Sequence, residues 1–219
     1  MTQHSESNNE PMDALKTYKK DIAYFMRRLY KRGLTTTSGG NISMLQDNFL
    51  LITPSQTDKG RMKAKEVCVV DTQGLNRTPK QKLSMETAMH QAVYAVRSDV
   101  RAIVHAHPPF ATSFAVSHQT ITTALMGESW SVLGLPAFAP YEIMGSEALA
   151  QNVAQAALHA NVVVMANHGI LAMGNSLLEA FDRIEVLENC AKIQLLASLN
   201  GTANELQSEQ IEAINKLIQ

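Results

Sequence analysis

Apolar residues recur every three or four positions in the N-terminal part of the chain, which is the period of an amphipathic helix. Asp13 can cap this predicted helix and Gly33 can end it. The same period predicts helices after Ser84 and after Ser146, a long helix over residues 176–199, and a short amphipathic segment near the end of the sequence. The apolar positions of the first helix are Leu15, Tyr18, Ile22, Phe25, Met26 and Leu29. Those of the helix after Ser84 are Met85, Ala88, Met89, Ala92, Val93 and Val96.

Short β-like runs lie between these helices and predict strands. Because strands and helices interleave, we expect a single α/β domain over residues 13–219, and hairpins near 41–53 and 166–173 indicate a mixed or antiparallel sheet. A polar, flexible tail is expected over residues 1–12. Residues 118–141 are rich in Thr and then punctuated by Gly and Pro, and they follow no regular period. The predicted strands are residues 41–45, 49–53, 67–71, 102–107, 162–166 and 170–173.

The composition narrows the class of protein. The chain has 219 residues, 45% hydrophobic and 18% charged, so it can form a core and is not disordered over most of its length. Its 19 Lys and Arg residues against 20 Asp and Glu residues lack the basic excess of a nucleic-acid-binding domain. Two cysteines exclude a disulfide scaffold and a Cys-based zinc finger, and we interpret Cys68 and Cys190 as buried, reduced thiols. No signal peptide is visible and no apolar run approaches the ~20 residues of a membrane span, so we expect a soluble cytoplasmic protein without a membrane partner.

Three of the seven histidines form a candidate metal site. His105 and His107 are two residues apart on a predicted strand, so their side chains leave the same face just before Pro108 and Pro109 end it. His168 lies in an Asn-His-Gly turn that also follows a strand. Three imidazoles without thiolates are typical of a catalytic site for zinc or a similar divalent cation. A single strand histidine is more often a core residue, and whether His168 meets the pair stays open at this point.

A carboxylate and three polar loops are further candidates. Glu86 is expected in the first turn of the helix after Ser84, where it either compensates the helix dipole or acts as a general acid or base. His90 lies one turn further on, so the two side chains share a face. Residues 37–41, residues 53–56 and the helix start at Ser84 could each bind an anion through backbone N–H groups, although as turns they need no ligand.

The order of these motifs resembles the class II aldolase/adducin family over about residues 14–199. The resemblance implies a three-layer α/β/α fold around a mainly antiparallel sheet, and a homotetramer with sites near subunit interfaces. By motif match, it implies that His105, His107 and His168 bind zinc and that Glu86 is the catalytic base. The phosphate pocket that it implies contains Ser38, Gly39, Gly40, Asn41, Ser55, Gln56 and Ser84. The motifs that carry the resemblance are Ser38-Gly-Gly-Asn-Ile-Ser43, Ile52-Thr-Pro-Ser55, Ser84-x-Glu86, Val104-His-Ala-His107 and Asn167-His-Gly169.

The activity that the resemblance implies is cleavage of a small ketose phosphate, similar to fuculose 1-phosphate, to dihydroxyacetone phosphate and an aldehyde through a metal-stabilised ene-diolate. Two positions depart from the pattern, since Gln56 and Met85 stand where the aldolases have Gly and Ser. No tyrosine follows Tyr141, so the proton donor that these aldolases take from their C-terminal tail is unidentified here.

Other reactions on the same scaffold stay open. Asp58-Lys-Gly-Arg61 and Ser84-Met-Glu-Thr87 are similar to stretches of methylthioribulose-1-phosphate dehydratases. A ribulose-phosphate 4-epimerase would have Asp where Glu86 stands. A non-catalytic, adducin-like interaction domain would lack the three histidines that are present here.

Overall fold

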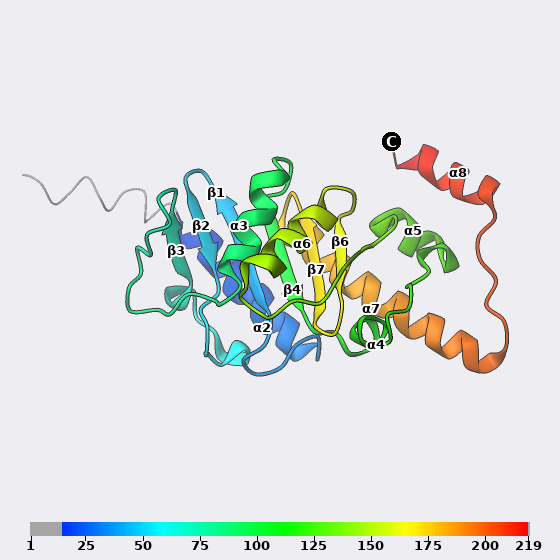
Figure 1. The fold of residues 1–219 in the computed structure, drawn as a ribbon, viewed down its shortest axis with the longest axis horizontal. Coiled ribbons are helices and arrows are strands. Elements are labelled where there is room, and N and C mark those ends of the chain that lie inside the picture. Colours follow the sequence, from blue (N-terminus) through cyan, green and yellow to red (C-terminus); the bar gives the residue numbers. More distant parts are fainter. Residues whose placement is uncertain (1–14, 219) are drawn as a thin grey trace, which may run out of the picture.

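A computed structural model describes residues 15–218, so the predicted tail and the Asp13 cap lie outside the described residues. Seven strands form one sheet in the order β3-β2-β1-β4-β7-β6-β5 (Figure 1). Every neighbouring pair is antiparallel except β5 and β6, which confirms the predicted mainly antiparallel sheet. The strands are β1 (Asn41–Gln46), β2 (Phe49–Ile52), β3 (Cys68–Asp71), β4 (Ala102–Ala106), β5 (Ala137–Ala139), β6 (Val162–Met165) and β7 (Gly169–Gly174).

Helices cover both faces of this sheet and bury a separate hydrophobic core on each. One core joins the sheet to α2, α4, α5 and α7, and the other joins it to α3 and α6. Successive side chains of β4 point to opposite faces of the sheet, so Val104 belongs to the first core and Ile103 to the second. The three-layer α/β/α prediction is therefore confirmed. The helices are α2 (Lys16–Lys31), α3 (Thr87–Val96), α4 (Pro109–Ser117), α5 (Gly127–Leu133), α6 (Glu147–Ala157), α7 (Leu177–Asn200) and α8 (Ser208–Leu217).

The predicted start of α3 is wrong. The helix begins at Thr87, with Glu86 as its N-cap residue, and Ser84 belongs to the turn before it. In that turn Thr87 N donates to Ser84 O at 3.2 Å, and Ser84 Oγ accepts from Glu86 N–H at 3.3 Å. Met85 consequently points outward with 61% of its surface exposed, and Val96 is also exposed at the other end of the helix. The cap predicted at Ser146 is present, since its side chain accepts from Leu149 N at the start of α6.

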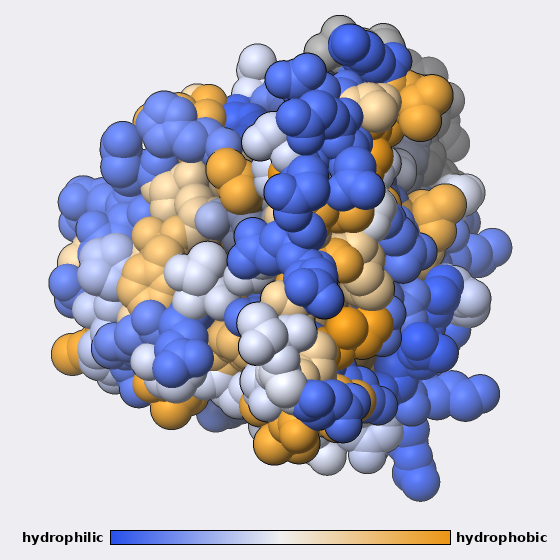
Figure 2. Space-filling model, turned by 90° about the vertical axis from the view of Figure 1, so that its right-hand side faces the viewer, coloured by the Kyte–Doolittle hydropathy of each residue, from blue (hydrophilic) through white to orange (hydrophobic). Residues whose placement is uncertain are grey.

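The region without a regular sequence period contains α5 and β5. The segment after α7 packs against it, because Leu206 N donates to Ala124 O at 2.8 Å and Trp130 Nε1 donates to Asn215 Oδ1 at 2.9 Å. Figure 2 shows this end of the molecule, where hydrophobic and hydrophilic residues alternate over the surface. Cys68 and Cys190 are buried and free, as predicted. Among residues 15–218, no helix has the length and apolar character needed to cross a membrane.

Candidate active site

The structure brings the three predicted histidines together at one end of the sheet. β4 and β7 are antiparallel neighbours, with Ala106 opposite Ile170, so the residues that follow β4 lie beside the turn that precedes β7. The rings of His105, His107 and His168 have centroids 4.7 to 5.6 Å apart. One nitrogen from each ring lies within 4.8 Å of the other two, so these residues could hold a metal ion.

Two glycines make room for this cluster. A Cβ at Gly169 would lie 2.5 Å from His107 Cδ2 and 2.6 Å from Ala106 O, distances that real Cβ atoms do not reach. A Cβ at Gly39 would lie 3.0 Å from His107 Nδ1. The Gly39 and Asn167-His-Gly169 motifs therefore pack directly against the same imidazole from two sides.

Glu86 lies between two of the histidines. Its Oε1 is 3.0 Å from His168 Nε2 and its Oε2 is 3.3 Å from His105 Nε2. Asn41 Nδ2 donates to Oε2 at 2.6 Å. Burial by itself would raise the pKa of this carboxyl group, but His105, His168 and the Asn41 amide together hold the pKa well below its usual range. Glu86 is therefore a buried carboxylate rather than a protonated acid.

Several polar atoms of the cluster have no hydrogen-bond partner. The two ring nitrogens of His168 and Glu86 Oε1 are buried without an assigned hydrogen bond, although Oε1 and His168 Nε2 are 3.0 Å apart. His105 Nδ1 donates to Ile170 O at 2.9 Å, so its Nε2 carries a lone pair, which faces the Glu86 carboxylate and lies 3.1 Å from His107 Nε2. Burial lowers the pKa of His105, and it lowers the pKa of His107 to about 3. Lone pairs and a carboxylate that converge in this way repel one another unless a cation lies among them, and three imidazoles beside a carboxylate suit zinc or a similar divalent ion.

The three predicted anion-binding segments adjoin one another beside this cluster. Asn41 lies opposite His105 in the β1–β4 ladder, which sets residues 38–41 next to the histidines. Ser55 N donates to Lys82 O at 2.9 Å, so the loop around Ser55 and Gln56 runs beside the segment that leads to Ser84. Gln56 has a left-handed φ of 54°, a conformation that a glycine adopts more readily.

Lys59 is a buried residue that the sequence pattern did not reveal. Its backbone N donates to Thr37 O at 2.9 Å and its Nζ donates to Pro54 O at 2.6 Å, so it ties two of the polar loops together. The side chain is 1% exposed, and burial lowers its pKa to about 8. A lysine in a polar loop is usually solvated, and the only sequence signal was its place in the Asp58-Lys-Gly-Arg61 stretch.

The remaining histidines have other environments. His90 is fully buried and reaches Glu86 through Asn41, whose Oδ1 lies 2.5 Å from His90 Nε2. His118 Nε2 contacts Asn167 Oδ1 at 2.7 Å and so supports the turn that holds His168. His159 is exposed after α6, and His4 lies outside the described residues.

A comparison with known proteins identifies the family. Residues 20–195 match the family described as "Class II Aldolase and Adducin N-terminal domain". The chain belongs to the class II aldolase and adducin family.

Three members illustrate its range of named activities. The 5-deoxy-D-ribulose 1-phosphate aldolase of Bacillus thuringiensis is 29% identical over 211 residues, which cover 92% of this chain and 95% of the relative. The 3-oxo-tetronate 4-phosphate decarboxylase of Haemophilus influenzae is 31% identical and covers 76% of this chain and 81% of its own. A solved structure described as L-fuculose 1-phosphate aldolase has a TM-score of 0.84 and 33% identity, covering 91% of this chain and 94% of its own. All three names are those of carbon–carbon lyases.

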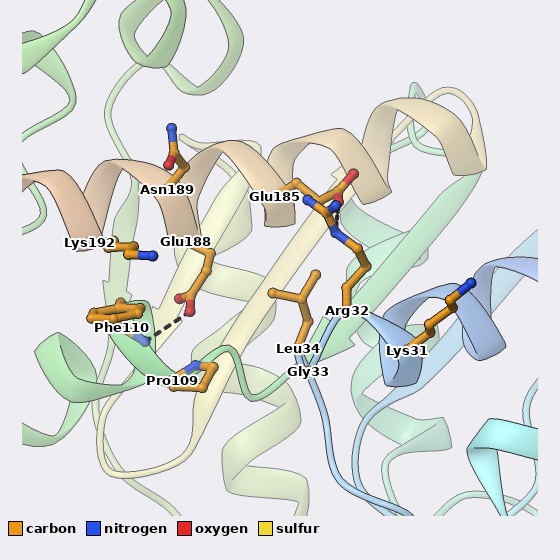
Figure 3. Close-up of a pocket in the computed structure, with 10 residues that line it drawn as sticks. All are labelled: Lys31, Arg32, Gly33, Leu34, Pro109, Phe110, Glu185, Glu188, Asn189 and Lys192. Atoms are coloured by element: carbon orange, nitrogen blue, oxygen red, sulfur yellow. Dashed lines mark hydrogen bonds and ion pairs between the residues drawn. The ribbon is translucent and has the colours of Figure 1, made fainter.

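This member of the class II aldolase and adducin family has an open pocket of about 540 Å³ between α2, α4 and α7 (Figure 3). Glu188 reaches across it from α7 and accepts from Phe110 N and Ala111 N at 3.0 and 2.8 Å. The carboxylate thereby caps the start of α4, which follows His107 directly. Glu188 therefore fixes the start of the helix that follows His107 and Pro108.

Proposed function

We propose that this protein is a zinc-dependent, or similarly metal-dependent, class II aldolase. It cleaves a small phosphorylated ketose to dihydroxyacetone phosphate and an aldehyde. The observation that carries the proposal is the position of the Glu86 carboxylate, 3.0 and 3.3 Å from the ring nitrogens of His168 and His105, among buried atoms without partners.

His105, His107 and His168 would hold the metal ion, which when bound would polarise the hydroxy-ketone and stabilise an ene-diolate. The two oxygens of Glu86 have different tasks. Oε2 is fixed by Asn41, whereas Oε1 has no assigned hydrogen bond and is the atom that takes up and returns the proton. Residues 38–40, Ser55, Gln56 and Ser84 would bind the phosphate through hydroxyl and backbone N–H groups. The Asn41 side chain already contacts Glu86 and His90, so we propose that only the backbone of Asn41 contributes to the phosphate pocket.

A decarboxylase is the second candidate. Loss of CO₂ from a 3-oxo-tetronate 4-phosphate leaves the same three-carbon ene-diolate, which gives dihydroxyacetone phosphate after protonation. The absence of any tyrosine after Tyr141 favours this reaction, because departing CO₂ needs no proton transfer at a hydroxyl whereas a departing aldehyde does. The named decarboxylase relative at 31% identity adds support. We also propose a cytoplasmic homotetramer with sites near its subunit interfaces.

The test is an assay of the full-length protein supplemented with zinc. Its substrates are 5-deoxyribulose 1-phosphate, fuculose 1-phosphate, 3-oxo-tetronate 4-phosphate and their unphosphorylated analogues. We expect dihydroxyacetone phosphate from a phosphorylated substrate, detected by coupled reduction with NADH, and the second product separates the candidates. An aldehyde supports the aldolase, and CO₂ supports the decarboxylase. Loss of water without chain cleavage, or no conversion of any substrate, would contradict the proposal.

A further inference from the structure

A ladder of buried polar side chains leads away from Glu86 between β1 and α3. Asn41 contacts both Glu86 and His90, at 2.6 and 2.5 Å. Ser43 contacts both His90 and Tyr94, since its Oγ lies 2.7 Å from His90 Nδ1 and 2.9 Å from Tyr94 OH. All five side chains are buried in the molecule.

The ladder arises because a strand and a helix have matching repeats. Asn41 and Ser43 are two residues apart on β1, which places them about 6.7 Å apart on one face. Glu86, His90 and Tyr94 are spaced by four residues on α3 and its N-cap, about 6 Å for each step. The strand residues therefore fit between successive helix residues, so Asn41, His90 and Ser43 each have a polar neighbour on either side.

The carboxylate fixes the direction of every hydrogen bond in the ladder. Glu86 can only accept, so Asn41 must present its Nδ2 to Glu86 and its Oδ1 to His90. His90 must then carry its proton on Nε2, and its Nδ1 accepts from the Ser43 hydroxyl. Ser43 in turn accepts from Tyr94. Every donor within the ladder thus points toward Glu86, and Tyr94 OH also lies 3.5 Å from Arg101 O outside it.

We propose that His90 is a positioning residue, which holds the Asn41 amide so that Glu86 Oε2 is fixed and Oε1 stays free to move the proton. This inference rests on the proposed function in assigning that role to Glu86. The ladder does not conduct protons, because an amide cannot pass a proton on without adopting a high-energy tautomer. Burial lowers the pKa of His90 to about 3, which agrees with a ring that remains neutral.

Two substitutions of His90 separate positioning from simple core packing. In His90→Gln, the amide N–H reaches the place of Nε2 and can still donate to Asn41. In His90→Asn, the shorter side chain reaches only the place of Nδ1 and leaves Asn41 without its donor. We expect His90→Gln to keep kcat within about threefold and His90→Asn to lower kcat by about 10- to 100-fold with little change in KM, the size of a lost hydrogen bond to a charged site. His159→Gln, which changes an exposed histidine outside the ladder, is the control and should leave kcat unchanged.

A spectroscopic measurement tests the ladder without any substrate. In ¹⁵N NMR spectra of the full-length protein, with and without added zinc, we expect His90 as the neutral Nε2–H tautomer. Glu86→Gln should shift the His90 Nε2–H resonance. An Nδ1–H tautomer, a resonance that Glu86→Gln leaves unchanged, or equal losses of kcat in His90→Gln and His90→Asn would overturn the inference. If the wild-type protein converts none of the candidate substrates, the proposed function fails while the NMR result still decides whether the ladder is present.

Discussion

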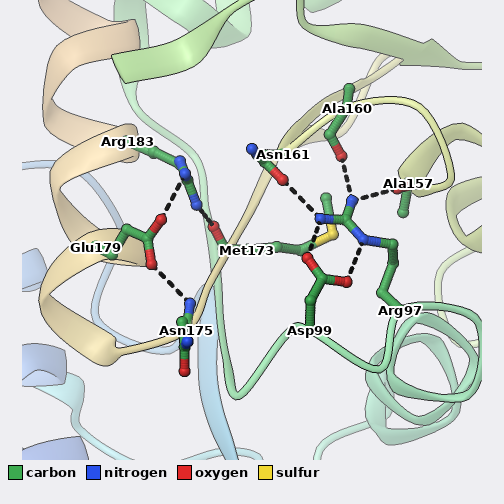
Figure 4. Close-up of polar contacts among 9 residues, drawn as sticks. All are labelled: Arg97, Asp99, Ala157, Ala160, Asn161, Met173, Asn175, Glu179 and Arg183. Atoms are coloured by element: carbon green, nitrogen blue, oxygen red, sulfur yellow. Dashed lines mark hydrogen bonds and ion pairs between the residues drawn. The ribbon is translucent and has the colours of Figure 1, made fainter. Parts of the chain in front are cut away.

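The two ends of strands β4 and β7 each hold a cluster of polar side chains. One cluster is partly exposed and fully paired, and the other is buried and only partly paired. At the end where β4 begins, Arg97 Nη1 donates to the carbonyl oxygens of Ala157 and Ala160 at 2.7 and 3.1 Å (Figure 4). Arg97 Nη2 donates to Asn161 Oδ1 at 2.8 Å, and Nε and Nη2 together bind the Asp99 carboxylate at 2.8 and 2.7 Å. This arginine thus connects the ends of three elements with each of its nitrogens engaged.

Arg183 completes the same end by donating to Met173 O and pairing with Glu179 at 2.6 Å. At the other end, by contrast, both nitrogens of His168 and one oxygen of Glu86 are buried without an assigned hydrogen bond. Buried polar groups in proteins are normally satisfied, and titratable groups that are not satisfied tend to belong to functional sites. We call the end with Arg97 and Arg183 the arginine end, and the end with Glu86 and His168 the histidine end. We infer that the arginine end stabilises the fold and that the histidine end is kept available for a cation and a substrate.

The largest effect is expected from His105→Ala/His107→Ala, which removes two of the three proposed ligands. Bound zinc should fall from about one ion per chain to background, and turnover should be lost with it. Elemental analysis of the purified protein measures the zinc. His159→Ala, which removes an exposed histidine, is the control and should keep both properties. Full zinc content in the double variant would show that the metal binds elsewhere.

Gly169→Ala tests the packing of the histidine end. The added methyl group would lie 2.5 Å from the His107 ring, so the ring must move and zinc affinity should fall by about 10- to 100-fold. Competition with a chelator measures this affinity. Gly127→Ala is the matched control, because its methyl group would meet only an ordinary contact at 3.6 Å. Equal affinities in the two variants would refute the idea that Gly169 shapes the site.

Arg97→Ala tests the arginine end, where it removes the hydrogen bonds that Arg97 donates. Because charged hydrogen bonds are worth about 1.5–3 kcal/mol, we expect the free energy of unfolding to fall by about 2–3 kcal/mol, with no loss of bound zinc. Chemical denaturation gives the first quantity and elemental analysis the second. Arg77→Ala, which removes a half-exposed partner of Asp71, should cost less than about 1 kcal/mol. A loss of zinc without a loss of stability would reverse the roles assigned to the two ends.

The smallest effect is expected from Gln56→Gly, at the edge of the histidine end. A non-glycine residue at φ of 54° is strained by roughly 1–2 kcal/mol, and the greater freedom of glycine in the unfolded chain offsets about 0.5–1 kcal/mol of the relief. The free energy of unfolding should therefore rise by about 0.5 kcal/mol. The change in the free energy of unfolding is compared with that of Asp47→Gly, which makes the same kind of substitution at a φ of 49° in the β1–β2 turn. A clear destabilisation would mean that the Gln56 side chain makes a favourable contribution in the folded protein.

The sequence was most informative where one local period controls the structure. The helical period over residues 176–199 predicted α7, and the hydrophobic runs over residues 162–166 and 170–173 predicted β6 and β7. β5 was missed because it has three residues and is defined by pairing with β6. The start of α3 was placed too early because the turn at Ser84 uses the same polar residues as a helix cap.

Within the site, the meeting of His105 and His107 follows from their spacing alone, whereas the approach of His168 depends on the pairing of β4 with β7. The burial of Lys59 depends on contacts with Thr37 and Pro54, which are distant in the sequence pattern. The link from Glu86 to His90 required Asn41, and so it depends on how β1 packs against α3. Contacts between elements, unlike the elements themselves, have no local period from which they can be predicted.

The central claim is that the Glu86 carboxylate, which Asn41 holds beside the three histidines, performs the proton transfer. The most direct measurement is kcat for release of dihydroxyacetone phosphate by zinc-loaded Glu86→Gln, compared with the wild type and with Glu212→Gln on the exposed face of α8. We expect Glu86→Gln to retain its zinc and lose about 10²- to 10⁴-fold in kcat, the range for removal of a general acid or base, while Glu212→Gln matches the wild type. Full activity in zinc-loaded Glu86→Gln would contradict the account.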